Sequence, residues 1–486
     1  MARVYLIYFD IRTGFYPELH HGLASLAAAI RQNGHVLAFH HLLKEESPEV
    51  LSAMILKFNP DIVGFSLATN QRKYLEKYSK AIHHQSKVLQ IVGGVHATID
   101  PMDVFNIDSI QGVCIGEGEQ TFPALLKKVD AGESILDTAG FWWRTRQGRI
   151  KKNPVPALNP DLSSLPYPDY SIFNVNSINE AASGWMTMML TRGCPHHCSY
   201  CANHVLRSIY PNKKDYVRVP PVEHAIGIIK NNLSYYSNVK GIVFGDDLLI
   251  WHKKWFKEFA DRYRCEIGLP FICNARAEYL TEDICSSLKK AGCVLVAIGV
   301  ESGSEWVRRY VLNRRASNDQ IIKACQLLKY FDIQILSFNI LGLPGETKHL
   351  MQETLSLNKR IEPDMGAAYY FFPYPGTQLR SICEQYGFLD ESSDELSGYL
   401  ERPTIKPIQW KRKDCVRIYH KLRLYFATRR ATRNLGFASS FIATCLYLLF
   451  SIFPSFFVSL FTKRSRLKYI LRKLMYKQLL PQEPKI

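Results

Sequence analysis

Short apolar runs alternate with longer segments of mixed polarity along the first 140 residues. Residues 4–9 predict a buried strand, and residues 62–66 and 88–92 predict two more. Residues 21–33 predict a helix with an alanine-rich packing face, and Gly34 ends it. Alternating strands and helices form a parallel sheet with helices on both faces. Residues 1–140 therefore predict a Rossmann-like, doubly wound α/β domain.

The same alternation returns over residues 186–400, after a proline-rich stretch. Residues 141–185 contain this stretch and are expected to form a stiff linker, because proline restricts the backbone and prevents helix. The later alternation is long enough for about six strand–helix units, which predicts a partial (β/α)6 barrel. Residues 401–486 predict a mostly helical, basic and partly apolar tail. Ligands are expected at the carboxyl ends of the strands in both domains.

The positive charge is concentrated in the tail. The chain has a net charge of +17, and residues 401–486 contain 19 Lys and Arg against 3 Asp and Glu, a net charge of +16. Residues 1–400 are balanced, with a net charge of +1. A nucleic-acid-binding core usually carries positive charge on its own surface. The distribution therefore disfavours nucleic acid as a partner and favours an anionic membrane surface.

Residues 436–462 form an uncharged, mostly apolar segment inside this tail. Basic residues flank it on both sides, at Arg429, Arg430, Arg433, Lys463, Arg464, Arg466 and Lys468. Its length suffices for a membrane span, but the flanking charges and Pro454 favour a re-entrant hairpin or an interfacial helix. A helix packed on the barrel is the alternative. Because Asp10 and Arg12 interrupt the only early apolar run, we expect no signal peptide. The expected location is the cytoplasm, peripheral or monotopic on the inner face of the membrane.

Three of the twelve cysteines stand close together, at Cys194, Cys198 and Cys201. The spacing Cys-x3-Cys-x2-Cys lets one short loop hold three irons of an iron–sulfur cube and leaves the fourth iron open to a small molecule. Zinc with a distant fourth ligand is the alternative, although zinc sites more often show two separated Cys-x2-Cys pairs. The other nine cysteines show no second cluster spacing.

This loop closely resembles the cluster loop of radical S-adenosylmethionine (SAM) enzymes. Thr191, Arg192 and Gly193 lead into the first cysteine and Tyr200 precedes the last, as in that family. The resemblance implies that the three cysteines hold a [4Fe–4S] cluster whose open iron binds SAM. An electron from the cluster would cleave SAM to methionine and a 5′-deoxyadenosyl radical.

Later strand ends extend the resemblance to SAM binding. An acidic turn after residues 242–244 would hold the SAM amino group, and the turns after two further strands would hold the ribose and the adenine. The SAM-binding residues that the resemblance implies are Tyr200, Gly245, Asp246, Asp247, Arg276, Glu301, Ser302 and Gly342. Ordinary structural roles stay open for some of them. The two aspartates could form a solvated turn, Arg276 could pair with Glu278, and Ser302 with Glu305 could begin a helix.

The first domain resembles the cobalamin-binding domain that precedes many radical SAM cores. The resemblance implies that Ser66, Gly93 and Gly94 line the tunnel for the nucleotide tail, and that Glu117 lies near the corrin edge. The Asp-x-His-x-x-Gly sequence, whose histidine ligates cobalt in some cobalamin domains, is absent. Cobalamin bound here is therefore expected to lack that histidine ligand. A domain of the same shape without the cofactor is the alternative.

Both resemblances point to the family that includes the anaerobic magnesium-protoporphyrin ester cyclase and the class B radical SAM methyltransferases. They imply a cobalamin-dependent enzyme that methylates carbon in a hydrophobic or lipid-like small molecule. A flavodoxin or ferredoxin would supply electrons. The alternatives are radical-mediated cyclisation or oxidation, RNA modification, and a cobalamin- or SAM-binding sensor.

Overall fold

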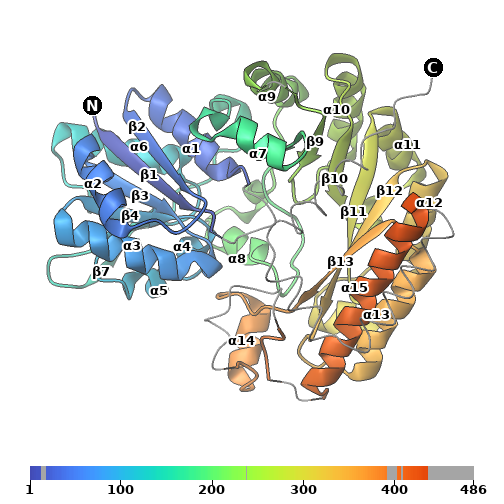
Figure 1. The fold of residues 1–486 in the computed structure, drawn as a ribbon. Coiled ribbons are helices and arrows are strands. Elements are labelled where there is room, and N and C mark those ends of the chain that lie inside the picture. The colour runs from blue at the N-terminus through green and yellow to red at the C-terminus, as the bar shows by residue number, and fades with distance from the viewer. Residues whose placement is uncertain (12–17, 237, 391–401, 407–408, 436–486) are drawn as a thin grey trace. The chain divides into compact units, whose positions relative to one another are not determined.

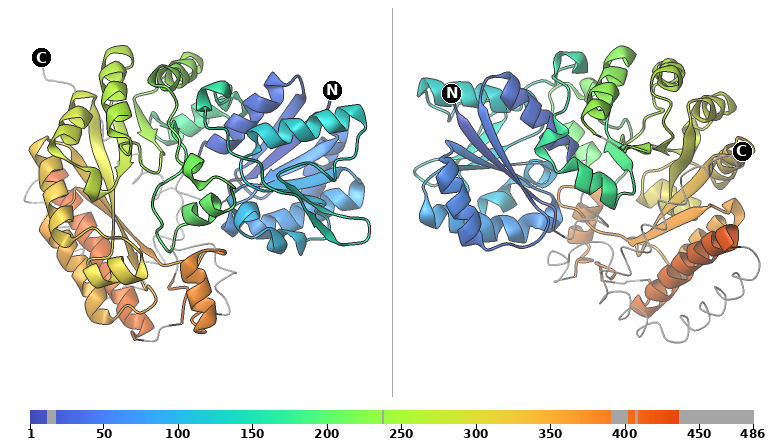
Figure 2. Two further views of the ribbon diagram at one scale, coloured as in Figure 1. Left: turned by 180° about the vertical axis from the view of Figure 1, so that it is seen from behind. Right: turned by 45° about the horizontal axis from the view of Figure 1, so that its top comes forward.

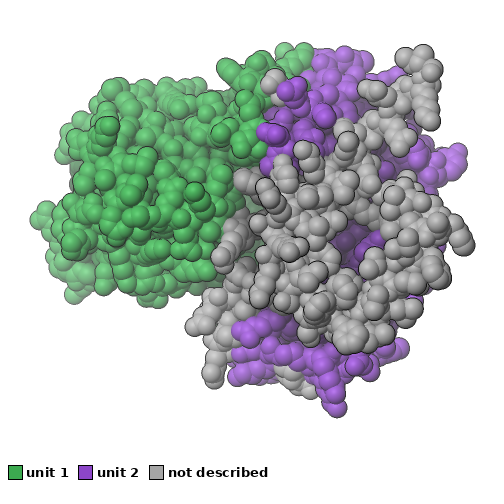
Figure 3. Space-filling view, viewed as in Figure 1, with its two compact units in different colours: residues 1–178, 191–237, 374–380 green, residues 179–190, 238–373, 381–486 purple. Residues whose placement is uncertain are grey.

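The computed structural model describes residues 1–11, 18–236, 238–390, 402–406 and 409–435. The chain divides into two compact units, shown in different colours in Figure 3. Unit 1 comprises residues 1–178, 191–237 and 374–380, and unit 2 comprises residues 179–190, 238–373 and 381–486. Each unit is built on its own, mainly parallel β-sheet (Figure 1). The predicted α/β class is confirmed, and the apolar segment 436–462 lies outside the described residues.

Unit 1 contains a seven-stranded sheet in the order β2-β1-β3-β4-β5-β6-β7. The first five strands of that order run parallel, β6 pairs antiparallel with β5, and β7 pairs antiparallel with β6. The strands are β1 (Arg3–Phe9), β2 (Val36–Leu42), β3 (Ile62–Ser66), β4 (Leu89–Gly93), β5 (Gly112–Cys114), β6 (Phe141–Arg144) and β7 (Ile150–Lys152).

Helices cover both faces of this sheet, as the alternating pattern predicts. They are α1 (His21–Gln32), α2 (Pro48–Phe58), α3 (Arg72–Gln85), α4 (Val95–Ile99), α5 (Pro101–Phe105) and α6 (Gly118–Ala131). Helices α1 and α6 pack together, and so do α2 and α3. Alternate side chains of β1, Tyr5, Ile7 and Phe9, belong to the core that includes Leu75 of α3. The other helices of this unit's sequence are α7 (Val175–Ala181), which continues into unit 2, α8 (Asn203–Ser208) and α9 (Val222–Tyr235).

The segment expected to be a linker holds more regular structure than its prolines suggest. Strands β6 and β7 lie inside residues 141–185 and extend the first sheet. Their aromatic side chains explain this, because Phe141 and Trp143 stack with ring centroids 5.4 Å apart and are both buried. The proline-rich residues 153–169 contain only one short helical turn, Leu162–Ser164.

Unit 2 contains a six-stranded, all-parallel sheet in the order β13-β12-β11-β10-β9-β8. It curls into the predicted partial barrel, with helices along its outer face (Figures 1 and 2). The strands are β8 (Trp185–Met188), β9 (Gly241–Phe244), β10 (Phe271–Ala275), β11 (Cys293–Glu301), β12 (Gln334–Leu341) and β13 (Met365–Tyr370). The helices are α10 (Lys253–Glu266), α11 (Glu282–Lys290), α12 (Asn318–Tyr330), α13 (Lys348–Ile361), α14 (Gln378–Gln385), whose first residues belong to unit 1, and α15 (Arg412–Leu435).

Helix α15 forms most of the described part of the basic tail. It packs on β13 and α13, and the ring of Phe426 lies directly over Gly366 of β13. The two ends of α15 have different surroundings. Cys415, near its start, is buried close to the turn after β12, whereas Arg429, nearer its end, lies beside Glu362. Within the ranges given above, no helix combines the length and apolarity needed to cross a bilayer.

Candidate functional site

The three clustered cysteines lie on a loop that follows β8 and belongs to unit 1. Gly193 begins the loop with a φ of +78°, a conformation that favours glycine. A Cβ at this position would lie 2.2 Å from the backbone carbonyl oxygen of Tyr216. Gly193 is therefore required twice, by its backbone conformation and by the close approach of a second chain segment.

The chemistry of the donor set fits a cluster with three protein ligands. Cys198 is buried, Cys194 and Cys201 are half-buried, and none is in a disulfide. The N–H of Cys201 donates to the carbonyl of Cys198 over 3.1 Å, and Asn203 Nδ2 lies 3.7 Å from Cys201 Sγ. In the described ranges, no group of three His, Cys, Asp or Glu side chains is placed to hold a metal. The fit thus rests on ligand type and spacing.

Two aromatic side chains accompany the loop. Tyr200 is half-buried and directly precedes the last cysteine. The ring of His204, in α8, lies near the backbone of Cys201 and Cys198, and its Nδ1 has no hydrogen-bond partner among the described residues. Burial lowers the pKa of His204. The imidazole is therefore neutral at pH 7 and adds no positive charge to the loop.

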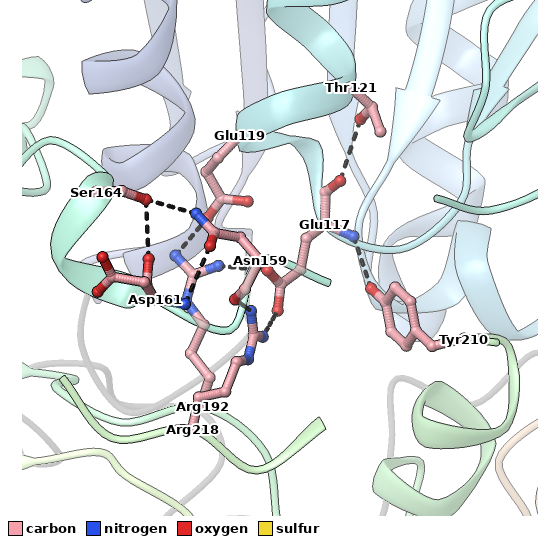
Figure 4. A network of polar contacts seen from close by, with 9 residues as sticks. All are labelled: Glu117, Glu119, Thr121, Asn159, Asp161, Ser164, Arg192, Tyr210 and Arg218. Atoms are coloured by element: carbon pink, nitrogen blue, oxygen red, sulfur yellow. Dashed lines mark hydrogen bonds and ion pairs between the residues drawn. The ribbon is translucent and has the colours of Figure 1, made fainter. Parts of the chain in front are cut away.

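An ion-pair network connects the residue before the cluster loop to the turn between β5 and α6 (Figure 4). Arg192 donates from Nη1 to Glu117 Oε2 over 2.7 Å and from Nη2 to Glu119 Oε1 over 2.6 Å. Arg218, which pairs with Arg192 in a backbone bridge, donates to the other oxygen of Glu117. Burial lowers the pKa of Arg192, but the carboxylates of Glu119 and Glu117 outweigh it and raise the pKa.

The network gives Glu117 a structural role, as the ion-pair partner of two arginines. Both of its carboxylate oxygens accept hydrogen bonds from guanidinium groups, and its N–H donates to the hydroxyl of Tyr210 over 2.9 Å. A pocket lined by Glu117, Glu119, Leu158, Asn159 and Tyr210 lies beside it. The position of Glu117 near the corrin edge stays a prediction. Its carboxylate binds the guanidinium groups of Arg192 and Arg218.

The other predicted cobalamin residues meet at the carboxyl edge of the first sheet. Ser66 ends β3 and lies opposite Gly93 of β4 in the parallel register. Gly94 follows with a φ of +96°, and a Cβ there would lie 2.7 Å from the N of Leu67 and 3.1 Å from Ser66 Oγ. The turn after β4 therefore passes close to β3 only because position 94 has no side chain. His20 Nε2 lies 3.0 Å from Ser66 Oγ.

At the carboxyl edge of the second sheet, the two predicted aspartates differ. Asp246 is fully buried, and its Oδ1 accepts the N–H of Leu190 over 3.1 Å. The N–H of Gly245 donates to the carbonyl of Met188 over 2.7 Å. These bonds join the end of β9 to the end of β8. Asp247 is exposed. The alternative of a solvated turn is thus wrong for Asp246.

Arg276 follows β10 and pairs with Glu278, as the alternative predicts. Its Nη2 lies 2.7 Å from Glu278 Oε1, and Arg276 is buried rather than on the surface. Burial raises the pKa of Glu278, but its bonds to Arg276 outweigh burial and leave the pKa lowered. The pair therefore keeps both charges in a largely buried place.

Glu301 is the last residue of β11, and Ser302 follows it. Glu301 has a φ of +63°, rare for a residue with a side chain, and the register with β12 shifts there. Arg314 Nη1 lies 3.8 Å from Glu301 Oε1. Ser302 is buried and its hydroxyl accepts the N–H of Ser304 over 3.3 Å. Glu305 accepts the N–H of Asn318 instead of that of Ser302, so the capping box that its spacing suggests does not form.

Gly342 directly follows β12, in a turn around a buried carboxyl group that the sequence did not single out. The N–H groups of Gly342 and Leu343 donate to Glu346 Oε2 over 2.9 and 3.1 Å. Glu346 is fully buried, and its Oε1 has no hydrogen-bond partner among the described residues. Burial raises the pKa of Glu346 to about 8, although the two N–H bonds lower it.

Comparisons with known proteins agree on both units. Residues 188–357 match the model of the radical SAM superfamily, and residues 15–126 match that of the B12-binding domain. The chain is a radical SAM enzyme with an N-terminal cobalamin-binding domain. Its cofactors are accordingly a [4Fe–4S] cluster, SAM and cobalamin. The predicted family and its enzymatic character are confirmed.

Individual relatives have low sequence identity to this chain, but the matches cover most of both chains. An uncharacterized methyltransferase from Pyrococcus horikoshii is 27% identical over 74% of this chain and 77% of its own. The anaerobic magnesium-protoporphyrin IX monomethyl ester cyclase of Rubrivivax gelatinosus is 23% identical over 84% of this chain and 73% of its own. The structure of the radical SAM methyltransferase TsrM from Kitasatospora setae, with cobalamin and a [4Fe–4S] cluster bound, has a TM-score of 0.65. It is 14% identical, and the match covers 79% of this chain and 78% of TsrM, which shows a shared fold.

Several side chains of this radical SAM enzyme escaped sequence reasoning. Glu346 follows Pro344 and Gly345, and nothing in a single sequence signals that its carboxyl group is buried. Glu119, Arg192 and Arg218 are separated by up to 99 residues and meet only in the fold. His20 carries one weak signal, because a polar residue directly before a helix often caps it.

Proposed function

We propose that this radical SAM enzyme transfers a methyl group to carbon in a hydrophobic small molecule, with cobalamin as a cofactor. The observation that carries the proposal is the presence of both matched domains in one chain, the three-thiol loop following directly on β8. When bound, the cluster supplies the electron that cleaves SAM, and cobalamin supplies a methyl carrier. The methyltransferase names of two relatives support the same reaction class.

The residues of this chain would bind and position these groups. Cys194, Cys198 and Cys201 would hold the cluster, and the Glu117 network would fix the loop by gripping Arg192. On the second sheet, the turn after β9 would hold the SAM amino group, with Asp247 exposed there and Asp246 bonded to Leu190. Gly245, Arg276, Glu301, Ser302 and Gly342 would also bind SAM at this edge. Tyr200, next to the last cysteine of the cluster loop, is the remaining residue that the resemblance assigns to SAM. Ser66, Gly93 and Gly94 would hold cobalamin.

Radical cyclisation is the second candidate. It is favoured by the match to the magnesium-protoporphyrin ester cyclase over 84% of this chain. The two reactions share SAM cleavage and differ in whether a methyl group leaves SAM.

Two further partners belong to the proposal. The basic residues 401–486 would attract an anionic membrane surface, where a hydrophobic substrate collects. An acidic one-electron donor such as flavodoxin or ferredoxin would reduce the cluster. Arg207 lies beside the cluster loop, with Nη1 3.1 Å from His197 Nε2, and Lys213 and Lys214 are exposed next to it. These three cations provide the charge that such a donor would recognise.

Product analysis tests the proposed reaction. Reduced protein carrying its cofactors is incubated with SAM and fractions of membrane lipid extract. We expect 5′-deoxyadenosine together with S-adenosylhomocysteine, and a substrate mass increase of one methyl group. Formation of 5′-deoxyadenosine without S-adenosylhomocysteine would favour cyclisation, and SAM binding without either product would contradict an enzymatic role.

Flotation with liposomes tests the membrane partner. The full chain is expected to float with vesicles that contain anionic lipid and to remain unbound with neutral ones. A chain truncated after Thr428 should lose the binding, and equal flotation of both chains would contradict a role for the tail.

A further inference from the structure

The hydroxyl of Ser66 has a neighbour that determines how it can bond. His20 Nε2 lies 3.0 Å from Ser66 Oγ at the carboxyl edge of the first sheet. His20 directly precedes α1, and its Nδ1 accepts the backbone N–H of Leu23 over 3.1 Å. One imidazole ring therefore contacts both the start of α1 and the end of β3.

These two contacts fix the tautomer of His20. A nitrogen that accepts an N–H carries no proton, so Nδ1 is unprotonated. Burial lowers the pKa of His20 to about 4, so the ring is neutral at pH 7 and has a single proton. That proton is on Nε2. The Nε2–H group donates, and Ser66 Oγ accepts.

The direction of this bond leaves the proton of the Ser66 hydroxyl available. Ser66 is 6% exposed, and no acceptor for its proton is found in the described parts of the chain. Because Gly94 has no side chain, the turn after β4 can lie against Ser66. A buried hydroxyl at a ligand-binding sheet edge is costly without an acceptor. A ligand atom with a lone pair would satisfy it.

The same contacts exclude His20 from metal ligation in this arrangement. Its Nδ1 lone pair is used by Leu23 and its Nε2 carries the proton, so neither nitrogen can bind cobalt without breaking a bond shown here. The ring is also held in place by Tyr8, whose ring lies edge-on with centroids 4.8 Å apart.

We propose that His20 is a positioning residue, which fixes the hydroxyl of Ser66 as a hydrogen-bond donor to the nucleotide tail of cobalamin. The inference rests on cobalamin being bound at this edge of the first sheet. The tail contains phosphate oxygens and a base nitrogen, which are the acceptors such a donor requires. His20 acts through Ser66 and does not touch the cobalt.

Binding of two corrinoids to single and double variants tests this. His20→Asn keeps a side-chain oxygen that can cap α1 but removes the Nε2–H donor. Ser66→Ala removes the hydroxyl. His21→Asn is the control, because this neighbouring histidine contacts the hydroxyl of Tyr170 instead (2.6 Å). Dissociation constants are measured for cobalamin and for cobinamide, which lacks the nucleotide tail.

We expect Ser66→Ala to weaken cobalamin binding about tenfold, the usual effect of one lost hydrogen bond. His20→Asn should weaken it by a similar or smaller factor, and the double variant should bind no worse than Ser66→Ala alone, because both act on one bond. Cobinamide affinity should not change. The electron paramagnetic resonance spectrum of bound cob(II)alamin should be the same in wild type and His20→Asn.

Four results would overturn the inference. Additive losses in the double variant would show that His20 acts apart from Ser66. Equal losses for cobinamide would place the contact on the corrin ring. A changed axial nitrogen coupling in His20→Asn would make His20 a cobalt ligand. If wild type binds neither corrinoid, the cobalamin-dependent function itself fails, whereas corrinoid binding that is insensitive to both variants contradicts only the inference.

Discussion

The carboxyl edges of the two sheets are built from different side chains. At the first sheet, Ser66 meets the neutral His20, and Asp10 accepts from His41. At the second sheet, β9 and β11 end near buried or largely buried carboxyl groups, those of Asp246 and Glu301. Carboxylates favour a cationic ligand with an ammonium and a sulfonium group, whereas neutral donors and acceptors favour a ligand rich in amides. The difference matches the proposed assignment of SAM to one edge and cobalamin to the other.

A substitution in the cluster loop is expected to have the largest effect on stability and iron content. Gly193→Ala would place a Cβ 2.2 Å from the carbonyl oxygen of Tyr216, so the loop has to move. We expect a loss of about 3 kcal/mol in the free energy of unfolding, with loss of bound iron. Gly132→Ala is the matched control, because Gly132 also has a positive φ, +65°, but no atom within 4 Å of the added Cβ. It should cost about 1 kcal/mol and leave iron content unchanged.

Urea unfolding and iron analysis of both variants check this. If Gly193→Ala behaves like Gly132→Ala in both measurements, the close approach of Tyr216 does not shape the loop.

The buried Glu346, at the carboxyl edge of the second sheet, predicts that the free energy of unfolding depends on pH. Its pKa is about 8 in the folded protein and near 4.5 when unfolded. Between these values the unfolded state releases the proton first, so the free energy of unfolding falls as pH rises. Glu346→Gln removes this fall, which is worth about 4 kcal/mol between pH 5 and pH 8.5. Unfolding at pH 5 and pH 8.5 measures it, with exposed Glu258 as the Glu258→Gln control. Equal slopes in Glu346→Gln and wild type would contradict the buried carboxyl assignment.

Breaking the Glu117 network should have a smaller effect on stability. Glu117→Gln leaves Arg192 and the buried Arg218 with weaker partners, and a cost of about 1–2 kcal/mol follows from partial exposure of the glutamate. We also expect less iron per chain, because Arg192 directly precedes the cluster loop. Glu133→Gln, at an exposed position, is the control. A variant that loses cobalamin but keeps its stability would instead favour the predicted corrin contact.

The smallest expected effect concerns the electron donor. Reversing charge with Lys213→Glu and Lys214→Glu should slow cluster reduction by flavodoxin several-fold at low salt and little at high salt. Reduction by dithionite should not change, since it needs no docking surface. Lys359→Glu with Arg360→Glu, at an exposed pair on α13, is the control. Equal slowing with dithionite would show that the lysines affect the cluster itself.

The sequence predicts the fold well because strand–helix alternation is a local pattern. Residues 62–66 are the strand β3 as expected, and the predicted helix 21–33 is α1 within one residue. The pattern of β6 and β7 was obscured by the prolines that follow. Site chemistry was harder to predict, because the paired groups are distant in sequence. Glu117 and Arg218 are 101 residues apart, and no local signal connects them. The buried state of Asp246 also depends on β8, more than 50 residues earlier.

One chain is expected to bind both a cluster and cobalamin, at separate sites. Protein purified without oxygen from cells supplied with cobalamin is analysed for iron, sulfide and cobalamin, in wild type, Cys198→Ala and the exposed-cysteine control Cys265→Ala. We predict about four irons and one cobalamin for wild type and control. Cys198→Ala should lose iron and 5′-deoxyadenosine formation while keeping cobalamin. Wild type without cobalamin, or Cys198→Ala that still cleaves SAM, would contradict the account.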